Sequence, residues 1–256
     1  MKLKRRTFLE VVGLGVAGAA GVPATRALST AARDPAAGAA PNKRWALVVD
    51  QKKCLGRENC NVCMAACHKA HNVPAVKDPR HEVKWVWKER FANVFPERVT
   101  PYTTAEAKAR PTVVLCNHCE NPPCVRVCPT QSTWKREDGI VMMDMHRCIG
   151  CRYCVVACPY GSRSFNFEDP RPYVAEPADY PTRTKGVVEK CNFCAERLAA
   201  GQRPLCVEAC EGIGCGALVF GDVRDPGSAV SVLLRENEVA RRKAELGTSP
   251  HVFYVL

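Results

Sequence analysis

Short apolar runs that precede groups of cysteines dominate the hydrophobic pattern of this 256-residue chain. Three such runs lie at 45–50, 139–144 and 186–189. Runs of this length that carry Val or Ile and are bounded by Gly or acidic residues are typical of strands. Residues 195–198 suit a short helix, which the following glycine and proline interrupt. We therefore predict a repeated unit of strand, cysteine loop and short helix.

Two further segments depart from this repeat. An aromatic insert before the second cysteine group contains Trp85 and Trp87, which alternate at strand spacing. We predict that both pack in the core, with a partner-binding surface as the alternative. The proline-rich residues 168–185 are predicted to form a loop. The tail predicts an amphipathic helix over 230–245 and a last strand over 251–256.

The N-terminus has the pattern of a targeting signal. Lys4-Arg5-Arg6-Thr7-Phe8-Leu9 precedes a weakly apolar stretch rich in Gly and Ala, which is too short for a membrane span. It resembles a twin-arginine signal peptide, which directs the export of folded proteins. We predict a signal peptide and flexible tether over 1–40 and a cysteine-rich region over 41–256. The mature protein is then expected in the periplasm, peripheral on the outer face of the cytoplasmic membrane.

Sixteen of the seventeen cysteines fall into four runs of four. The third run reads C-x2-C-x2-C-x3-C-P, the ligand pattern of bacterial 4Fe-4S ferredoxins. Its first three cysteines lie within seven residues, too close for all to find well-shaped disulfide partners. Structural zinc does not account for the third and fourth cysteine followed by Pro. We predict four 4Fe-4S clusters, with sixteen ligands: Cys54, Cys60, Cys63, Cys67, Cys116, Cys119, Cys124, Cys128, Cys148, Cys151, Cys154, Cys158, Cys191, Cys194, Cys206 and Cys210.

The net charge of +11 at first indicates a nucleic-acid binder. Residues 1–32 hold five basic residues and one acidic residue, so the remainder carries +7. An oxidised 4Fe-4S core has a charge of about +2 and its four thiolates contribute −4, which leaves about −2 at each site. Four sites cancel the excess. We interpret the Lys and Arg side chains as compensation for cluster charge and predict no nucleic-acid partner.

Several motifs match one known family. They include Cys116-Asn-His-Cys119, His146-Arg-Cys148-Ile-Gly-Cys151 and Ala157-Cys158-Pro159. From Trp45 to Leu256 the chain resembles the four-cluster ferredoxin-type subunits of membrane-bound oxidoreductases. With its paired arginines and His68-x-x-His71-Asn-Val-Pro, it is most similar to the DsrO-like periplasmic subunits of the DsrMKJOP complex of sulfur metabolism. The resemblance implies an α+β fold of two ferredoxin-like modules, each holding two clusters, with loop-rich insertions.

The resemblance also implies that runs exchange their last cysteine. In module A, built from runs 54–67 and 191–210, Cys210 would complete the first-run site and Cys67 the fourth-run site. In module B, built from runs 116–128 and 148–158, Cys158 would complete the second-run site and Cys128 the third-run site. We name each site after the run that supplies its other three ligands.

Two departures from the family pattern concern the first and fourth runs. Residues 55–59 fill a gap that normally holds two residues, and His68 stands where the family has Pro. Glu211 replaces the Pro that usually follows the fourth run. Cys215 is left over; we predict a buried, inert thiol, with an alternative ligand or a reactive thiol as the other possibilities.

A few polar residues near the runs are interpreted as structural. His118 is predicted to be a hydrogen-bonded loop residue, with a donor to a cluster or a direct ligand as the alternative. Asp50, Asp144 and Glu189 precede their runs and are predicted to be turn or cap residues. No serine or histidine forms a nucleophile-base pattern, so we predict no catalytic site.

Clusters spaced along one small chain form a relay for single electrons. We predict an electron-transfer subunit of a membrane-bound redox complex of sulfur metabolism, acting on the periplasmic side. Its partners would be a quinone-reactive integral membrane subunit and cytochrome or other redox subunits. One alternative is the iron–sulfur relay of a molybdopterin reductase of polysulfide, tetrathionate or nitrite type. The alternative from another class is a zinc- or disulfide-stapled binding module.

Overall fold

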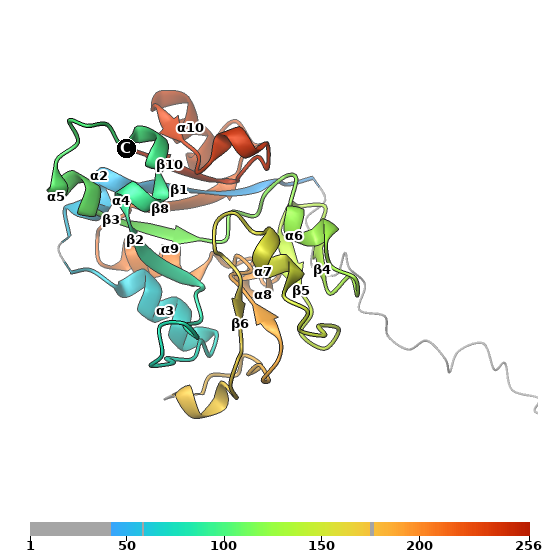
Figure 1. Cartoon of the computed structure of the whole chain (residues 1–256). Coiled ribbons are helices and arrows are strands. Elements are labelled where there is room, and N and C mark those ends of the chain that lie inside the picture. The colour runs from blue at the N-terminus through green and yellow to red at the C-terminus, as the bar shows by residue number, and fades with distance from the viewer. Residues whose placement is uncertain (1–41, 58, 175–176) are drawn as a thin grey trace, which may run out of the picture. The chain divides into compact units, whose positions relative to one another are not determined.

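The computed structural model describes residues 42–57, 59–174 and 177–256 (Figure 1). The signal peptide and tether predicted for 1–40 lie outside these ranges. Within them, strands and short helices alternate along the chain. The α+β class is therefore confirmed.

The largest sheet has four strands in the order β8-β1-β10-β9. The central β1 (Trp45–Asp50) runs parallel to β10 (Val252–Val255) and antiparallel to β8 (Leu218–Asp222). β9 (Val239–Ala240) pairs with the other edge of β10. The strands predicted at 45–50 and 251–256 are thus confirmed, and their pairing joins the two ends of the described region.

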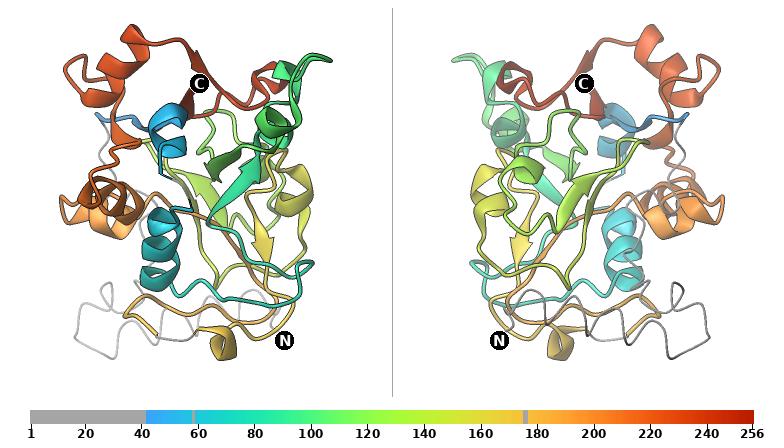
Figure 2. Two further views of the ribbon diagram at one scale, coloured as in Figure 1. Left: turned by 90° about the vertical axis from the view of Figure 1, so that its left-hand side faces the viewer. Right: turned by 90° about the vertical axis from the view of Figure 1, so that its right-hand side faces the viewer.

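Both faces of this sheet are buried. Leu47 and Val49 of β1 face the main core, whereas Ala46 and Val48 face a smaller one that includes Val230. The helix α10 (Ala229–Glu236) packs on β8 and β1 and so covers this second face (Figure 2). Alternating contacts of this kind explain why the whole run 46–49 is apolar.

The long helix predicted over 230–245 is wrong beyond Glu236. Asn237 has an extended backbone, and the chain then returns to the sheet as β9. Ala240 and Val239 pair with Tyr254 and Val255. This pairing satisfies the backbone at the edge of β10, so a tertiary contact overrides the helical pattern.

The middle of the chain forms three two-stranded sheets. They pair β2 (Val86–Arg90) with β3 (Pro111–Leu115), β4 (Thr133–Lys135) with β5 (Val141–Met143), and β6 (Ser164–Phe165) with β7 (Val188–Glu189). The strands expected before the third and fourth runs are β5 and β7, whereas β3 was not predicted. Trp85 and Trp87 are both buried, so the packing interpretation is confirmed.

The helices are short, and six of those that the structure describes contain or directly follow cysteines of the runs. Asp50 caps the first of them by accepting a hydrogen bond from the Lys53 amide at 3.0 Å, as predicted. Helices of one or two turns are unstable alone and depend on tertiary packing. They are α2 (Gln51–Leu55), α3 (Val62–Ala70), α4 (Phe91–Val94), α5 (Ala105–Ala109), α6 (Pro123–Arg126), α7 (Tyr153–Ala157), α8 (Ala195–Ala199) and α9 (Leu205–Gly212), with 3-10 turns at Pro96–Arg98, Arg171–Tyr173 and Ala244–Leu246. The six that contain or directly follow cysteines of the runs are α2, α3, α6, α7, α8 and α9.

Two helix pairs bring distant runs together. α3 packs against α9, which joins the first run to the fourth, and α6 packs against α7, which joins the second run to the third (Figure 1). The main core continues from the sheet into these helices and includes six buried cysteines: Cys63, Cys67, Cys116, Cys191, Cys206 and Cys210. The candidate ligands are therefore also core residues.

Candidate metal-cluster sites

The first-run site is a pocket between α2, α3 and α9. Its wall includes the apolar side chains of Val113 and Leu218. Burial, followed by the neighbouring thiols, raises the pKa of Cys63 to about 12. Such thiols become ligands only if a metal displaces their protons. The cysteines that line the pocket are Cys54, Cys60, Cys63, Cys210 and, in addition, Cys215.

The fourth-run site lies where α3 meets α9. Cys67 is in α3, and its neighbouring thiols are those of Cys191, Cys206 and Cys194. Burial, reinforced by these thiols, raises the pKa of Cys67 well above its usual value. The structure thus places Cys67 with the cysteines of the fourth run, the set that the resemblance implies.

The second-run site is a pocket at the end of β3. Cys116, Cys119, Cys124 and Cys158 all line it, and Cys158 reaches it from the end of α7. Burial raises the pKa of Cys119 to about 12, and the thiols of Cys116 and Cys124 act in the same direction. As in the first-run and fourth-run sites, three cysteines come from one run and the fourth is the last cysteine of another run.

The third-run site is the most exposed. Cys154 in α7 is buried and packs with Cys148, whereas Cys151 is exposed. The thiol of Cys128, just after α6, lies 3.1 Å from the Ser132 hydroxyl. Although burial raises the pKa of Cys128, hydrogen bonds from Ser132 and other donors lower it to about 7. The packing of α6 on α7 brings the chain around Cys128 toward the third run.

The four sites adjoin one another through individual cysteines. Cys63 of the first-run site neighbours Cys206 of the fourth-run site. Cys191 of the fourth-run site neighbours Cys116 of the second. The second and third sites meet where Cys124 packs with Cys154. The order in space is therefore first-, fourth-, second- and third-run site.

Buried cations lie between these sites. Arg163 donates from Nη2 to the Cys124 sulfur at 3.1 Å, and Lys190 donates to the Cys191 carbonyl at 2.7 Å. Burial lowers the pKa of Arg163, but the thiols of Cys124 and Cys154 outweigh it and raise the pKa overall. Burial lowers the pKa of Lys190, and the nearby thiols only partly oppose it. Both cations stand where negative cluster charge would need compensation.

Comparison with known proteins finds iron–sulfur relatives of this chain. A model of a 4Fe-4S dicluster domain matches residues 109–171 and again 168–223. The chain is 44% identical to the Hdr-like menaquinol oxidoreductase iron-sulfur subunit 1 of Archaeoglobus fulgidus, over 98% of this chain and 97% of that protein. It belongs to the iron–sulfur, electron-transfer subunits of membrane-bound oxidoreductases.

Other relatives of this iron–sulfur subunit come from reductases of sulfur compounds. A tetrathionate reductase subunit of Salmonella typhimurium is 37% identical, over 100% of this chain and 89% of its own length. A polysulfide reductase chain of Wolinella succinogenes is 35% identical, over 83% of this chain and 94% of its own length. Among the described residues, no helix of the subunit is both long and apolar enough to cross a membrane.

Polar residues around the sites mostly have structural roles. His118 is fully buried, stacks on Phe193 with a centroid distance of 3.7 Å, and accepts a hydrogen bond at Nδ1 from the Val141 amide at 3.0 Å. It is a hydrogen-bonded loop residue, as predicted. Because it also lines the second-run pocket and its Nε2 has no hydrogen-bond partner among the described residues, the alternative of a donor to a cluster stays a prediction. Asp144 accepts from the His146 amide at 2.9 Å, so the turn interpretation is confirmed.

The turn or cap role predicted for Glu189 is wrong, because Glu189 lies in strand β7. Its buried carboxylate pairs with Arg183 and accepts hydrogen bonds from the Trp85 indole and Asn166 amide, both at 2.7 Å. Arg183 also donates to the Asn72 carbonyl at 3.0 Å. Through Arg183, the Glu189 carboxylate of β7 is therefore connected to the loop after α3. This connection depends on contacts between distant segments, so the local sequence carried no signal for it.

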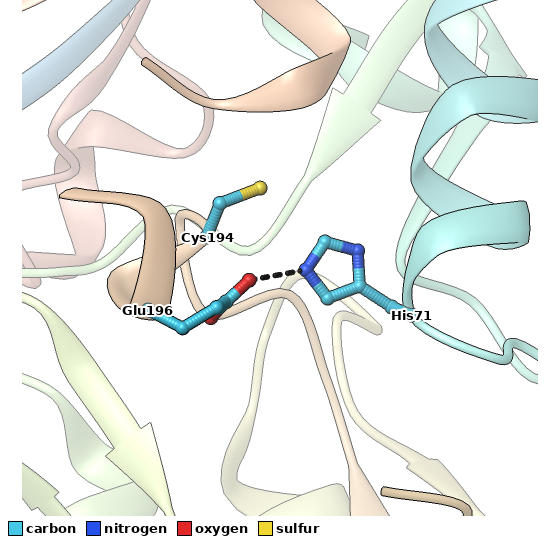
Figure 3. Close-up of side chains that lie close together, drawn as sticks. All are labelled: His71, Cys194 and Glu196. Atoms are coloured by element: carbon cyan, nitrogen blue, oxygen red, sulfur yellow. Dashed lines mark hydrogen bonds and ion pairs between the residues drawn. The ribbon is translucent and has the colours of Figure 1, made fainter. Parts of the chain in front are cut away.

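His71 is a functional candidate to which the sequence assigned no role beyond its place in a family motif. Its Nε2 pairs with the Glu196 carboxylate at 2.8 Å, and Nδ1 donates to the Cys67 carbonyl at 3.0 Å. Figure 3 shows His71, Cys194 and Glu196 pointing toward one another, with their ligand atoms within 4.8 Å. Because Cys194 belongs to the fourth-run site, we interpret the group as part of that site's surroundings. The nearby His68 instead donates a hydrogen bond from Nε2 to the Val86 carbonyl at 3.0 Å.

The environment of His71 favours its charged form. Burial lowers its pKa, but hydrogen bonds with Cys194 and Glu196 outweigh this effect and raise the pKa to about 9. A buried imidazolium beside a candidate ligand sulfur would stabilise additional negative charge there. Charge and hydrogen bonds at the sulfurs are among the factors that set cluster potentials.

We predict that His71→Gln lowers the reduction potential of the fourth-run cluster by about 60 mV, a tenfold change for a one-electron couple. The measurement is a redox titration followed by electron paramagnetic resonance. His81→Gln is the matched control, because His81 also pairs with a carboxylate, Glu168 at 3.0 Å, and stacks on an aromatic ring, that of Phe167. An unchanged potential in His71→Gln, or an equal shift in the control, would contradict the prediction.

Gly150 lies in the loop between two candidate ligands of the third-run site, Cys148 and Cys151. Its φ is +69°, and a Cβ there would lie 2.3 Å from the Gly186 carbonyl oxygen. We predict that Gly150→Ala displaces this loop, loses the third-run cluster and lowers the thermal midpoint. Gly161→Ala is the control, because its φ of +64° is similar but no atom of the described residues lies within 4 Å of its added Cβ.

The control isolates the cost of the left-handed backbone, about 1 kcal/mol. Iron analysis and thermal unfolding of both variants measure the difference. Equal losses would mean that the contact with Gly186 has no role in the site.

Proposed function

We propose that this subunit holds four 4Fe-4S clusters on the sixteen cysteines of its four runs and relays single electrons between them. The supporting observation is the adjacency of thiols from successive sites, which gives the order first-, fourth-, second- and third-run. Each bound cluster would supply one centre that accepts and releases an electron. The exchanged cysteines group the sites into two modules, one for the first and fourth runs and one for the second and third.

The protein's own residues would keep the interior sites dry and balance their charge. Arg163 and Lys190 place buried cations beside the second-run site, and His71 places one beside the fourth. Buried anionic clusters need such partners because charge is costly in a medium of low polarity. The excess of basic residues in the sequence is consistent with this role.

The third-run end is the proposed contact with the membrane partner. Cys151 is exposed there, and Val156, Ile149 and Tyr153 are 86%, 67% and 62% exposed. Exposed apolar residues on a short helix and the loop before it favour a protein interface. We propose that a quinone-reactive integral membrane subunit docks on this surface. Cytochrome or other redox subunits would exchange electrons at the first-run end.

The complex is proposed to act in sulfur metabolism on the periplasmic side, as a DsrO-like subunit does. The names of the tetrathionate and polysulfide relatives support a sulfur compound, and the paired arginines near the N-terminus support export in the folded state. The same names are also compatible with the alternative, an iron–sulfur relay of a tetrathionate or polysulfide reductase of the molybdopterin type. The proteins that bind the subunit distinguish the two.

Anaerobic purification of the tagged subunit from detergent-solubilised membranes of its own host tests the proposal. We expect a brown protein with about sixteen iron atoms per chain. An integral membrane subunit should co-purify with it. A colourless protein, or about eight iron atoms, would refute the four-cluster relay. A co-purifying molybdopterin subunit would favour the alternative complex.

A further inference from the structure

The first-run site contains one thiol more than a cluster needs. Cys215 lines the same pocket as Cys54, Cys60, Cys63 and Cys210. Its sulfur lies 3.6 Å from the Lys53 carbonyl, which places it beside α2 and next to Cys54. The second-run pocket, in contrast, is lined by four cysteines of the described part of the chain.

The turn after α9 brings Cys215 to this pocket. The Cys215 amide donates to the Cys210 carbonyl at 3.2 Å, so the chain folds back on the end of the helix. Gly214 and Gly216 flank Cys215 with φ of +69° and +58°, which glycine adopts without strain.

Two thiols, those of Cys210 and Cys215, are available for a single iron atom of the first-run cluster. A 4Fe-4S cube takes one cysteine ligand for each iron, and Cys54, Cys60 and Cys63 would occupy three. Cys210 and Cys215 both border the remaining space, and their backbones are hydrogen-bonded to each other. Neither thiol is engaged in a disulfide. We propose that Cys210 and Cys215 are interchangeable ligands of the fourth iron in the first-run site. This proposal rests on the proposed function, since it requires a cluster in that site.

The exchange needs no outside reactant. An iron–sulfur bond to Cys215 forms as the bond to Cys210 breaks, and the proton of the Cys215 thiol passes to the released Cys210 thiolate. No electron is transferred. In a variant without the Cys210 thiol, Cys215 binds the iron directly and releases its proton to solvent.

Serine variants of the full-length protein, matured and purified anaerobically, test the proposal. Cys158→Ser is the matched control, because Cys158 also comes from the end of a run and completes another run's pocket, which has no fifth thiol among the described residues. We expect about sixteen iron atoms in wild type, Cys210→Ser and Cys215→Ser, and about twelve in Cys158→Ser and in Cys210→Ser/Cys215→Ser. The paramagnetic signal of the first-run cluster should persist in Cys210→Ser with changed g values.

Each outcome has a definite meaning. If Cys210→Ser falls to about twelve iron atoms like the control, Cys215 is not a ligand and the proposal is wrong. Retention in both Cys210→Ser and Cys158→Ser would mean that the introduced serine binds iron, which also overturns it. This comparison of single variants decides the question even if the double variant does not fold. A wild-type protein without four clusters would instead refute the proposed function before any variant is considered.

Discussion

Cys67→Ser is expected to remove one whole cluster and lower the iron content from about sixteen to about twelve atoms per chain. The lost cluster should be that of Cys191, Cys194 and Cys206, although Cys67 belongs to the first run. The physical reason is position: Cys67 lies in α3, which packs on α9, and its neighbouring thiols are those of the fourth run. Serine is a poor substitute for a thiolate ligand of iron.

Low-temperature electron paramagnetic resonance of the reduced protein distinguishes the affected site. Cys54→Ser is the comparison, because Cys54 lies in the pocket of Cys60 and Cys63. The two variants should lose different signals. Loss of one common signal would show that each run binds its own cluster, and the exchange between runs would then be wrong.

Removal of iron is expected to unfold most of the protein. The main core includes six cysteines of the runs, and the four sites join segments that are far apart in the chain. Without clusters, these sites become polar voids inside the core, and voids and unpaired polar groups both destabilise folded proteins. The short helices α2 to α9 cannot persist without tertiary packing. The outcome resembles metal-dependent folding in small metal-binding domains.

Circular dichroism and limited trypsin digestion measure this effect before and after oxidative removal of iron with a strong iron chelator. We expect loss of most of the helical signal and cleavage about tenfold faster or more, since cleavage follows the open population. EDTA without oxidant is the control, because it extracts zinc but leaves assembled clusters in place. A fold that survives iron removal, or that EDTA alone disrupts, would contradict the prediction.

Local features of this protein could be predicted from its sequence. The spacing of Cys148, Cys151 and Cys154 places three thiols within one loop, so the type of metal site follows from a few neighbouring residues. The strands at 45–50 and 251–256 also depend on local apolar runs. The helix expected over 230–245 failed at Asn237, because the pairing of β9 with β10 outweighs helical periodicity there.

Contacts between distant segments could be identified only from the tertiary structure. Run spacing leaves open which last cysteine completes which site, and the family resemblance only implied an answer; the packing of α3 on α9 places Cys67 among the fourth-run thiols. The same kind of long-range packing sets His71 beside Cys194 and brings Cys215 into the first-run pocket. The hydrophobic pattern of a short segment does not predict such long-range contacts, because they depend on how helices and strands pack and not on neighbouring residues.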